Sequence, residues 1–290
     1  ISYKQAMLEF GSDKPDLRNP LRIVDVTDFF QRCTFKPFHG QTVRAIKVSN
    51  KMSKGFHEKL LKFATSIGMG GLGYLEVKED LSYKGPIDKF IPDDMKAEIR
   101  EIASLKAGDT IFFIADKEKQ AALYAGQLRN ELGQRLDLLE KNAYRFCFIN
   151  DFPMYEYDEE QKKIIFTHNP FSMPQGGLEA LETKDPSEIL AYQYDIVCNG
   201  IELSSGAVRN HDMKIMVKAF ELVGLGEEDV KAKFPAMYNA FCYGAPPHAG
   251  IAPGVDRMVM LIAGEDSIRE IIPFPMNKNA QDLMMGLSLI

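Results

Sequence analysis

The 290-residue sequence lacks the signatures of zinc-ribbon, secreted and membrane proteins. No Cys-x-x-Cys pair occurs, which excludes a zinc ribbon and argues against a disulfide framework. The longest apolar runs, such as Met258–Ala263, are far shorter than the roughly 20 residues that cross a bilayer. The first residues, Ile-Ser-Tyr-Lys-Gln, do not resemble a signal peptide. We therefore expect a cytoplasmic protein with no membrane partner, whose cysteines are widely scattered: Cys33, Cys147, Cys198 and Cys242.

The sequence also lacks a positive net charge, internal repeats and low-complexity segments. Its formal net charge is −6, so the overall field repels phosphate, and a nucleic-acid partner must be met by a local basic surface. With 45% hydrophobic and 26% charged residues, the composition is that of a globular protein. The length allows one large domain or two of ordinary size.

The first residues predict a helix over residues 2–10 that ends at Gly11. Ser2 to Gln5 has the form of a capping box at the start of that helix. Because Ile1 immediately precedes this box, we expect the chain to begin at a cut and not at a natural terminus. Residues 11–18 are too rich in breakers for regular structure.

From about residue 21 to residue 139, segments with strand and helix patterns alternate and predict a compact α/β module. Strands are expected over residues 43–48, 72–77 and 110–114. Helices are expected over residues 53–67, 93–104 and 117–139. The last of these helices is expected to break at Gly126 or Gly133.

The pattern changes after about residue 142. Strands are expected over residues 144–149 and 163–167, a Gly/Pro-rich loop over 169–177, and a hairpin at Asn199-Gly200. Helices follow over residues 212–223 and 227–243, and a strand, a loop and a helix occupy residues 247–263. The whole pattern predicts an α/β module inserted into, or attached to, an antiparallel-sheet domain.

The expected hairpin brings two carboxylates to one face. A type I′ turn at Asn199-Gly200 pairs Val197 with Glu202, and Asp195 shares the face of Val197. Asp195 and Glu202 then lie diagonally, with Cα atoms about 7–8 Å apart. Two carboxylates at that separation repel unless a cation lies between them, and hard oxygens suit Mg²⁺. The pattern fits two solvated surface acids equally well.

Arg209 lies farther along the same strand, and its guanidinium could bind a carboxylate in a bidentate manner. It is seven residues from Glu202, so a regular strand would place the two on opposite faces. A bulge near Gly206 would bring them to one face. Taken alone, Arg209 is more typical of a surface arginine.

Glycines and apolar residues alternate from Gly250 and lead into a helix with Asp256 and Arg257 on its first turn. Small residues let a ligand approach the backbone, and a helix N-terminus offers unpaired N–H groups to phosphate. Asp256 and Arg257 could equally form a structural pair.

The run Gly250–Met260 resembles motif 3 of class II aminoacyl-tRNA synthetases. Five further segments are similar, in the same order, to bacterial-type aspartyl-tRNA synthetases. The segments Thr167–Pro174 and Leu203–Ala207 resemble α-proteobacterial members more than enteric ones. Residues 21–142 resemble the GAD domain of that family, which is shared with some tRNA-dependent amidotransferase subunits. The five segments are Gly11–Arg18, Asp151–Met154, His168–Phe171, Asn199–Leu203 and Gly244–His248.

The resemblance implies an α+β fold: part of a class II antiparallel-sheet catalytic domain with an inserted α/β GAD-type domain. Residues 1–20 would be a catalytic-domain segment after motif 2, residues 21–142 the insertion, and residues 143–290 the half of the catalytic domain that contains motif 3. An amino-terminal anticodon-binding domain and motifs 1 and 2 are absent from these residues. We therefore expect that the 290 residues alone do not activate aspartate.

The resemblance also implies site residues and partners. His168 and Arg209 would contact aspartate, and Asp195 with Glu202 would hold Mg²⁺. The ATP site would be formed by Glu202, Gly254, Val255, Asp256 and Arg257. No side-chain nucleophile is implied, because the amino acid attacks with its own carboxylate. The expected reaction is ATP-dependent formation of aspartyl-adenylate and transfer to tRNA(Asp), with tRNA(Asn) as a possible second acceptor, by a homodimer in the full-length protein.

Two alternatives remain open from the sequence. A class II relative that makes asparagine or another amide from aspartyl-adenylate generally lacks the inserted module, so residues 21–142 count against it. A non-catalytic tRNA- or protein-binding module with a GAD-like domain fits these residues, but it does not explain why Glu202, Arg209 and Arg257 keep ligand-binding identities.

Overall fold

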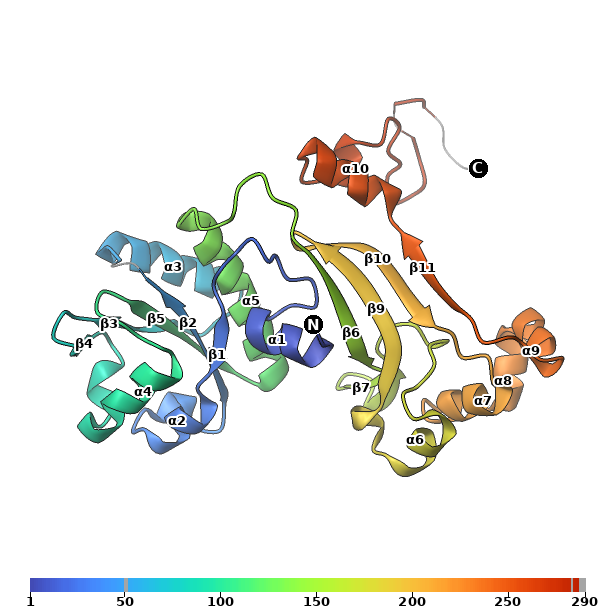
Figure 1. The fold of residues 1–290 in the computed structure, drawn as a ribbon, viewed down its shortest axis with the longest axis horizontal. Coiled ribbons are helices and arrows are strands. Elements are labelled where there is room, and N and C mark those ends of the chain that lie inside the picture. The colour runs from blue at the N-terminus through green and yellow to red at the C-terminus, as the bar shows by residue number, and fades with distance from the viewer. Residues whose placement is uncertain (50–51, 283, 287–290) are drawn as a thin grey trace. The chain divides into compact units, whose positions relative to one another are not determined.

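The computed structural model describes residues 1–49, 52–282 and 284–286 (Figure 1). The chain forms two compact units, Ile1–Phe146 and Cys147–Ile290. The division of function among residues 1–20, 21–142 and 143–290 stays a prediction. Helices and antiparallel strand pairs occur in both units, in agreement with the expected α+β class.

The first unit is built on a five-stranded sheet in the order β1-β2-β5-β3-β4, and every pair of neighbours is antiparallel. Its strands are β1 (Ile23–Asp25), β2 (Thr42–Val48), β3 (Gly73–Val77), β4 (Tyr83–Lys84) and β5 (Thr110–Asp116). Its helices are α1 (Tyr3–Phe10), α2 (Thr27–Arg32), α3 (Lys54–Ser66), α4 (Lys96–Ile102) and α5 (Glu118–Arg135). Short 3-10 turns lie at Lys36–Phe38, Asp88–Phe90 and Asp93–Met95.

This sheet is covered on both faces, because alternate residues of its central strands point into two different cores. Phe113 of β5 packs with residues of α2 and α4, whereas Phe112 packs with residues of α3 and α5. Figure 1 shows α3 and α5 on one side of the sheet and α2 and α4 on the other. The first unit is therefore a three-layer scaffold with its own interior.

The expected elements of this unit are largely confirmed. The helix over residues 2–10 is capped by Ser2, and Gly11 ends it with a left-handed backbone. Ser53 caps α3 by accepting a hydrogen bond from the Phe56 N–H. The helix over residues 93–104 begins as a 3-10 turn, and the short β1, α2 and β4 were not expected.

The expected break in the last helix is wrong: α5 runs without interruption through Gly126 and Gly133. Both glycines serve close packing. A β-carbon at Gly126 would overlap the carbonyl oxygen of Gly11, and one at Gly133 would overlap the side-chain amide of Asn19. A glycine inside a helical pattern marked a close backbone approach here and not an end.

The second unit contains a four-stranded sheet in the order β11-β10-β9-β6 and a separate antiparallel pair, β7-β8. Its strands are β6 (Phe146–Pro153), β7 (Tyr155–Asp158), β8 (Lys163–Phe166), β9 (Leu190–Cys198), β10 (Ile201–Val208) and β11 (Ala249–Pro253). Its helices are α6 (Gly177–Thr183), α7 (Met213–Glu221), α8 (Glu227–Lys233), α9 (Pro235–Cys242) and α10 (Val255–Ala263). Short 3-10 turns lie at Pro186–Glu188 and Ile268–Glu270.

One helix expected over residues 227–243 is in fact two, α8 and α9, which meet at Phe234. Pro235 begins α9, and proline lacks the N–H that would continue α8. The short α6 and β7 were also not expected. The hairpin at Asn199-Gly200 and the strand and helix over residues 247–263 are confirmed.

Candidate functional site

The hairpin between β9 and β10 has the turn that the Asn-Gly pair predicts. Asn199 and Gly200 both have positive φ, 52° and 84°, as a type I′ turn requires. Val197 pairs with Glu202, as expected. The register of the strands is therefore fixed by the turn at this end of the hairpin.

A β-bulge follows immediately. Glu202 pairs with Val197, but the next pair is Ser204 with Ile196, so Leu203 is the extra residue. The bulge therefore lies at Leu203 and not near Gly206. Gly206 has another role: a β-carbon there would overlap the carbonyl oxygen of Gly250 on β11 and the ring of Tyr194.

The bulge has the predicted consequence for the faces of β10. Beyond it, Ser205 pairs with Asp195, so Ser205 lies on the same face as Asp195 and Glu202. Alternation along the strand carries that face through Ala207 to Arg209. Without the extra residue, Glu202 and Arg209 would lie on opposite faces.

The two carboxylates of this face have the chemistry that a hard cation prefers. Asp195 is buried and Glu202 is partly buried, and both make further interactions. Among the described residues, no group of three or more His, Cys, Asp or Glu side chains is arranged to hold a metal. Mg²⁺ usually binds one or two carboxylates together with phosphate oxygens and water. The pair therefore fits a Mg²⁺ ion that arrives with a nucleotide.

The bulge also connects the hairpin to the start of α10. The Gly254 N–H donates to the Leu203 carbonyl at 2.7 Å. Arg257 Nη1 donates to the Glu202 carbonyl at 2.6 Å and to Glu202 Oε1 at 3.1 Å. Val255 and Asp256, on the first turn of α10, are exposed. The helix N-terminus and its arginine are thus held beside Glu202 and remain open to solvent.

Arg209 lies at a small cavity of about 270 Å³. The cavity is lined by Phe171, Arg209, Asn210, Met237, Phe241, His248, Ala249 and Gly250. The backbone N–H of Arg209 donates to the His248 carbonyl at 2.9 Å. A β-carbon at Gly250 would lie 3.9 Å from Nη2 of the Arg209 side chain. The small residues of β11 therefore leave space next to the guanidinium.

Asn210 also lines this cavity, although no pattern in the sequence indicated it. Its side chain is 1% exposed, and Nδ2 has no hydrogen-bond partner within the described parts of the chain. A buried donor without a partner costs free energy unless a ligand accepts from it. His248, which the sequence did not indicate, also lines the cavity, and its Nδ1 lies 2.9 Å from the Pro246 carbonyl oxygen, which can only accept. The cavity thus presents the guanidinium of Arg209, a cation that suits a carboxylate.

His168 is not among the residues that line this cavity. Its ring packs edge-on against Phe152, with ring centroids 4.9 Å apart. The loop that follows it is bonded to the end of β10, because the Asn210 N–H donates to the Phe171 carbonyl at 2.8 Å. The role expected for His168 stays a prediction, as do those of the other site residues.

Comparison with known proteins places the chain in a family. A family model described as tRNA synthetases class II (D, K and N) matches residues 1–278. The chain belongs to this family. The resemblance read from motif 3 and its neighbouring segments is thereby confirmed.

Relatives of this class II synthetase chain are similar over nearly its whole length. An aspartate–tRNA(Asp/Asn) ligase of Zymomonas mobilis is 55% identical over 99% of the chain and 49% of its own length. One of Gluconobacter oxydans is 55% identical over 98% of the chain and 49% of its own length. Both are α-proteobacterial, as the sequence indicated. The chain spans about half the length of the curated relatives it matches.

Among solved structures, an aspartyl-tRNA synthetase from Entamoeba histolytica aligns with 83% of the chain and 44% of its own length, at 18% identity and a TM-score of 0.37. A TM-score this low has no bearing on the fold. Within the described residues of this class II synthetase, no helix is both long and apolar enough to cross a membrane.

Proposed function

We propose that these residues serve an aspartate–tRNA ligase, which activates L-aspartate with ATP and transfers it to tRNA(Asp), with tRNA(Asn) as a second acceptor. The observation that carries the proposal is the bulge at Leu203. It puts Glu202 and Arg209 on one face of β10 and places Arg257 beside Glu202. The Arg257–Glu202 ion pair, proposed for the nucleotide, and the cavity at Arg209, proposed for the carboxylate, then belong to the same unit.

The ATP end of the proposed site is the start of α10. Glycine at 254 and small side chains before it let a nucleotide approach the backbone, and the helix N-terminus favours phosphate. Arg257 would bind phosphate oxygens, oriented by its two hydrogen bonds to Glu202. Asp195 and Glu202 would hold Mg²⁺, which supplies positive charge against the negative α-phosphate. The residues of this chain orient the nucleotide and do not attack it.

The aspartate end is the cavity at Arg209. A guanidinium that pairs with the side-chain carboxylate of the substrate separates aspartate from neutral asparagine. The α-carboxylate of aspartate would be the nucleophile, so no side chain needs to form a covalent bond.

We also propose that activation needs residues beyond these 290, since the relatives are about twice as long. The test is aspartate-dependent exchange of pyrophosphate into ATP, measured for this chain and for a protein that also contains the remaining half of its relatives' length. We expect exchange from the longer protein alone. Exchange by the 290 residues would overturn the second proposal, and its absence from both would overturn the first.

A binding module without catalysis is the second candidate, and the charge of the first unit favours it. That unit contains 24 lysines and arginines against 20 aspartates and glutamates, a net +4 in a chain of net −6. Such a module would bind RNA with its site residues unused. If the 290-residue chain and the longer protein bind RNA equally well, and the longer protein shows no pyrophosphate exchange, this candidate is favoured over the ligase.

A further inference from the structure

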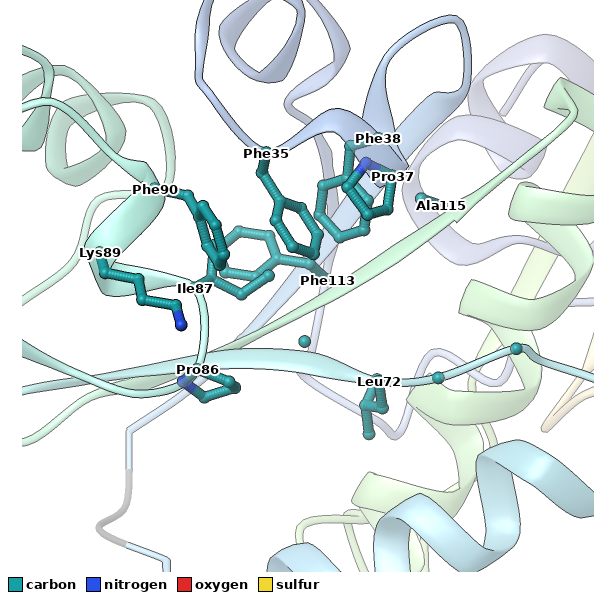
Figure 2. Close-up of a pocket in the computed structure, with 13 residues that line it drawn as sticks. Phe35, Pro37, Phe38, Leu72, Pro86, Ile87, Lys89, Phe90, Phe113 and Ala115 are labelled. Carbon is teal, nitrogen blue, oxygen red and sulfur yellow. The ribbon is translucent and has the colours of Figure 1, made fainter.

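The proposed ligase site does not use a pocket of about 600 Å³ in the first unit (Figure 2). It lies between the 3-10 turns at Lys36–Phe38 and Asp88–Phe90 and the glycine-rich segment that leads into β3. Phe38 and Phe113 form its buried floor. The pocket is therefore a part of the fold and not a gap between two mobile segments.

Aromatic rings reach from this floor to the mouth of the pocket. Phe35 and Phe90 are only half-buried, with centroids 4.8 Å apart and planes tilted by 47°. The two rings pack against each other, and Figure 2 shows both beside the open space of the pocket. Pro37 and Pro86, both exposed, add flat apolar surfaces at the mouth. Half-covered phenylalanine rings suit a planar partner that stacks on them.

One cation lies at this mouth. Lys89 is exposed, and its Nζ lies 5.0 Å from the centre of the Phe90 ring. An ammonium group next to an aromatic face is the pairing that binds a stacked base together with its phosphate. The charge of the unit points the same way, because its surplus of basic residues, 24 against 20, contrasts with 11 against 21 in the second unit.

The backbone on the opposite side leaves room for such a ligand. Gly70 and Gly71 line the pocket, and a β-carbon at either would meet no atom within 4 Å. Gly73, the first residue of β3, has no such space, because a β-carbon there would overlap the side chain of Ile87. The glycines therefore border open space at the mouth and a packed wall below it.

We propose that this pocket binds one unstacked nucleotide of a single-stranded RNA segment, with the base on the rings of Phe35 and Phe90 and the phosphate at Lys89. The inference extends the proposed function by naming a contact for its RNA partner outside the site on β10. It does not need catalysis, so its test and the exchange assay can fail independently.

The chain contains no tryptophan, so Phe90→Trp gives it a single tryptophan inside the pocket, which is excited selectively over the 11 tyrosines at long wavelength. The 290-residue chain with this substitution is titrated with an unstructured RNA hexamer, with an abasic hexamer of the same charge, with AMP, and with the peptide Asp-Asp-Phe-Asp-Asp. We expect quenching by the RNA hexamer. Base stacking on an aromatic ring contributes about 1–3 kcal/mol, so the abasic hexamer should bind roughly tenfold to hundredfold more weakly.

Two substitutions in the reporter protein separate contact from folding. Lys89→Ala should weaken hexamer binding and lower the slope of log affinity against log salt by about one. Lys141→Ala removes an exposed lysine outside the pocket and should change only the non-specific binding of RNA. Gly71→Leu should fill the mouth and abolish quenching. Gly55→Leu, another glycine with open space around it, is the matched control and should leave quenching unchanged.

Quenching that needs the base and is lost in Gly71→Leu supports the proposal. Binding of AMP as tightly as the hexamer supports the same nucleotide chemistry with a free nucleotide as its source. Equal binding of the abasic and normal hexamers, or quenching by the acidic peptide in place of RNA, overturns it.

Discussion

The two units treat the faces of their sheets differently. In the first unit, β2 and β5 are buried on both faces, and Phe112 and Phe113 point into separate cores. In the second unit, β11 is mostly exposed, and the face that carries Glu202 and Arg209 opens to a cavity. The first sheet is thus enclosed by its helices, whereas the second leaves one face of β10 beside a cavity.

Their charges differ in the same sense. The first unit has a net charge of +4, from 24 basic and 20 acidic residues, and the second has −10, from 11 and 21. Anionic ligands of the second unit must therefore be bound against its field by a few local cations. In the proposed site these cations would be Arg209 and Arg257, so single substitutions should have their largest effects there.

The largest effect is expected from Arg209→Gln in the longer, active protein. Truncating one partner of a buried charge pair costs about 2–5 kcal/mol, so kcat/KM for aspartate should fall roughly a thousandfold, with the KM for ATP little changed. Pyrophosphate exchange measures both constants. Arg269→Gln, an exposed arginine of the same unit, is the control and should be neutral. Equal losses in the two variants would remove Arg209 from the site.

The next effect tests the closed packing of the first unit. Gly126→Val would push a side chain into the Gly11 carbonyl, and overpacking of this kind costs about 3 kcal/mol. In urea unfolding we expect two transitions, of which only that of the first unit moves. Gly55→Ala, in a helix with open space, should stabilise the same unit slightly. If Gly126→Val left both transitions in place, the close contact between α1 and α5 would be wrong.

The sequence predicted local features better than distant ones. Ser2, Ser53 and Asn199-Gly200 act within four residues of themselves, and their caps and turn formed as expected. Gly126 did not end its helix, because its role is set by Gly11, which lies 115 residues away in the chain. Tertiary contact, and not local propensity, decided what that glycine does.

The site shows the same limit. Parity along β10 predicted that a bulge is needed between Glu202 and Arg209, and the bulge exists. The predicted position of the bulge, near Gly206, was wrong. The bulge lies at Leu203, whose carbonyl accepts a hydrogen bond from the Gly254 N–H, and no local pattern reveals a contact with a residue so far along the chain. Asn210 was missed for a related reason: only the fold buries its side chain and leaves Nδ2 without a hydrogen-bond partner among the described residues.

A smaller effect is expected from pH. Burial raises the pKa of the Cys33 thiol from its ordinary value near 9 to about 11. Between these values the unfolded chain loses the proton and the folded one keeps it, so stability falls as pH rises from about 9 to 11, by about 2 kcal/mol. Burial also raises the pKa of Cys147 in the second unit. Cys33→Ala should flatten the pH dependence of the first transition only; flattening of both would mean that the units unfold together.

The smallest effects should come from one helix cap in each unit. Ser53 accepts one hydrogen bond, from the Phe56 N–H at 3.2 Å, whereas Asp212 accepts two, from Lys214 and Ile215 at 2.8 and 3.3 Å, and adds a negative charge at the start of α7. Replacement by alanine should cost about 0.5–1 kcal/mol for Ser53 and about 1–2 kcal/mol for Asp212. Each loss should appear in the transition of its own unit. The double variant should show both losses unchanged in size, because distant sites in separate units add, and a deviation beyond about 0.5 kcal/mol would show that the two units are energetically coupled.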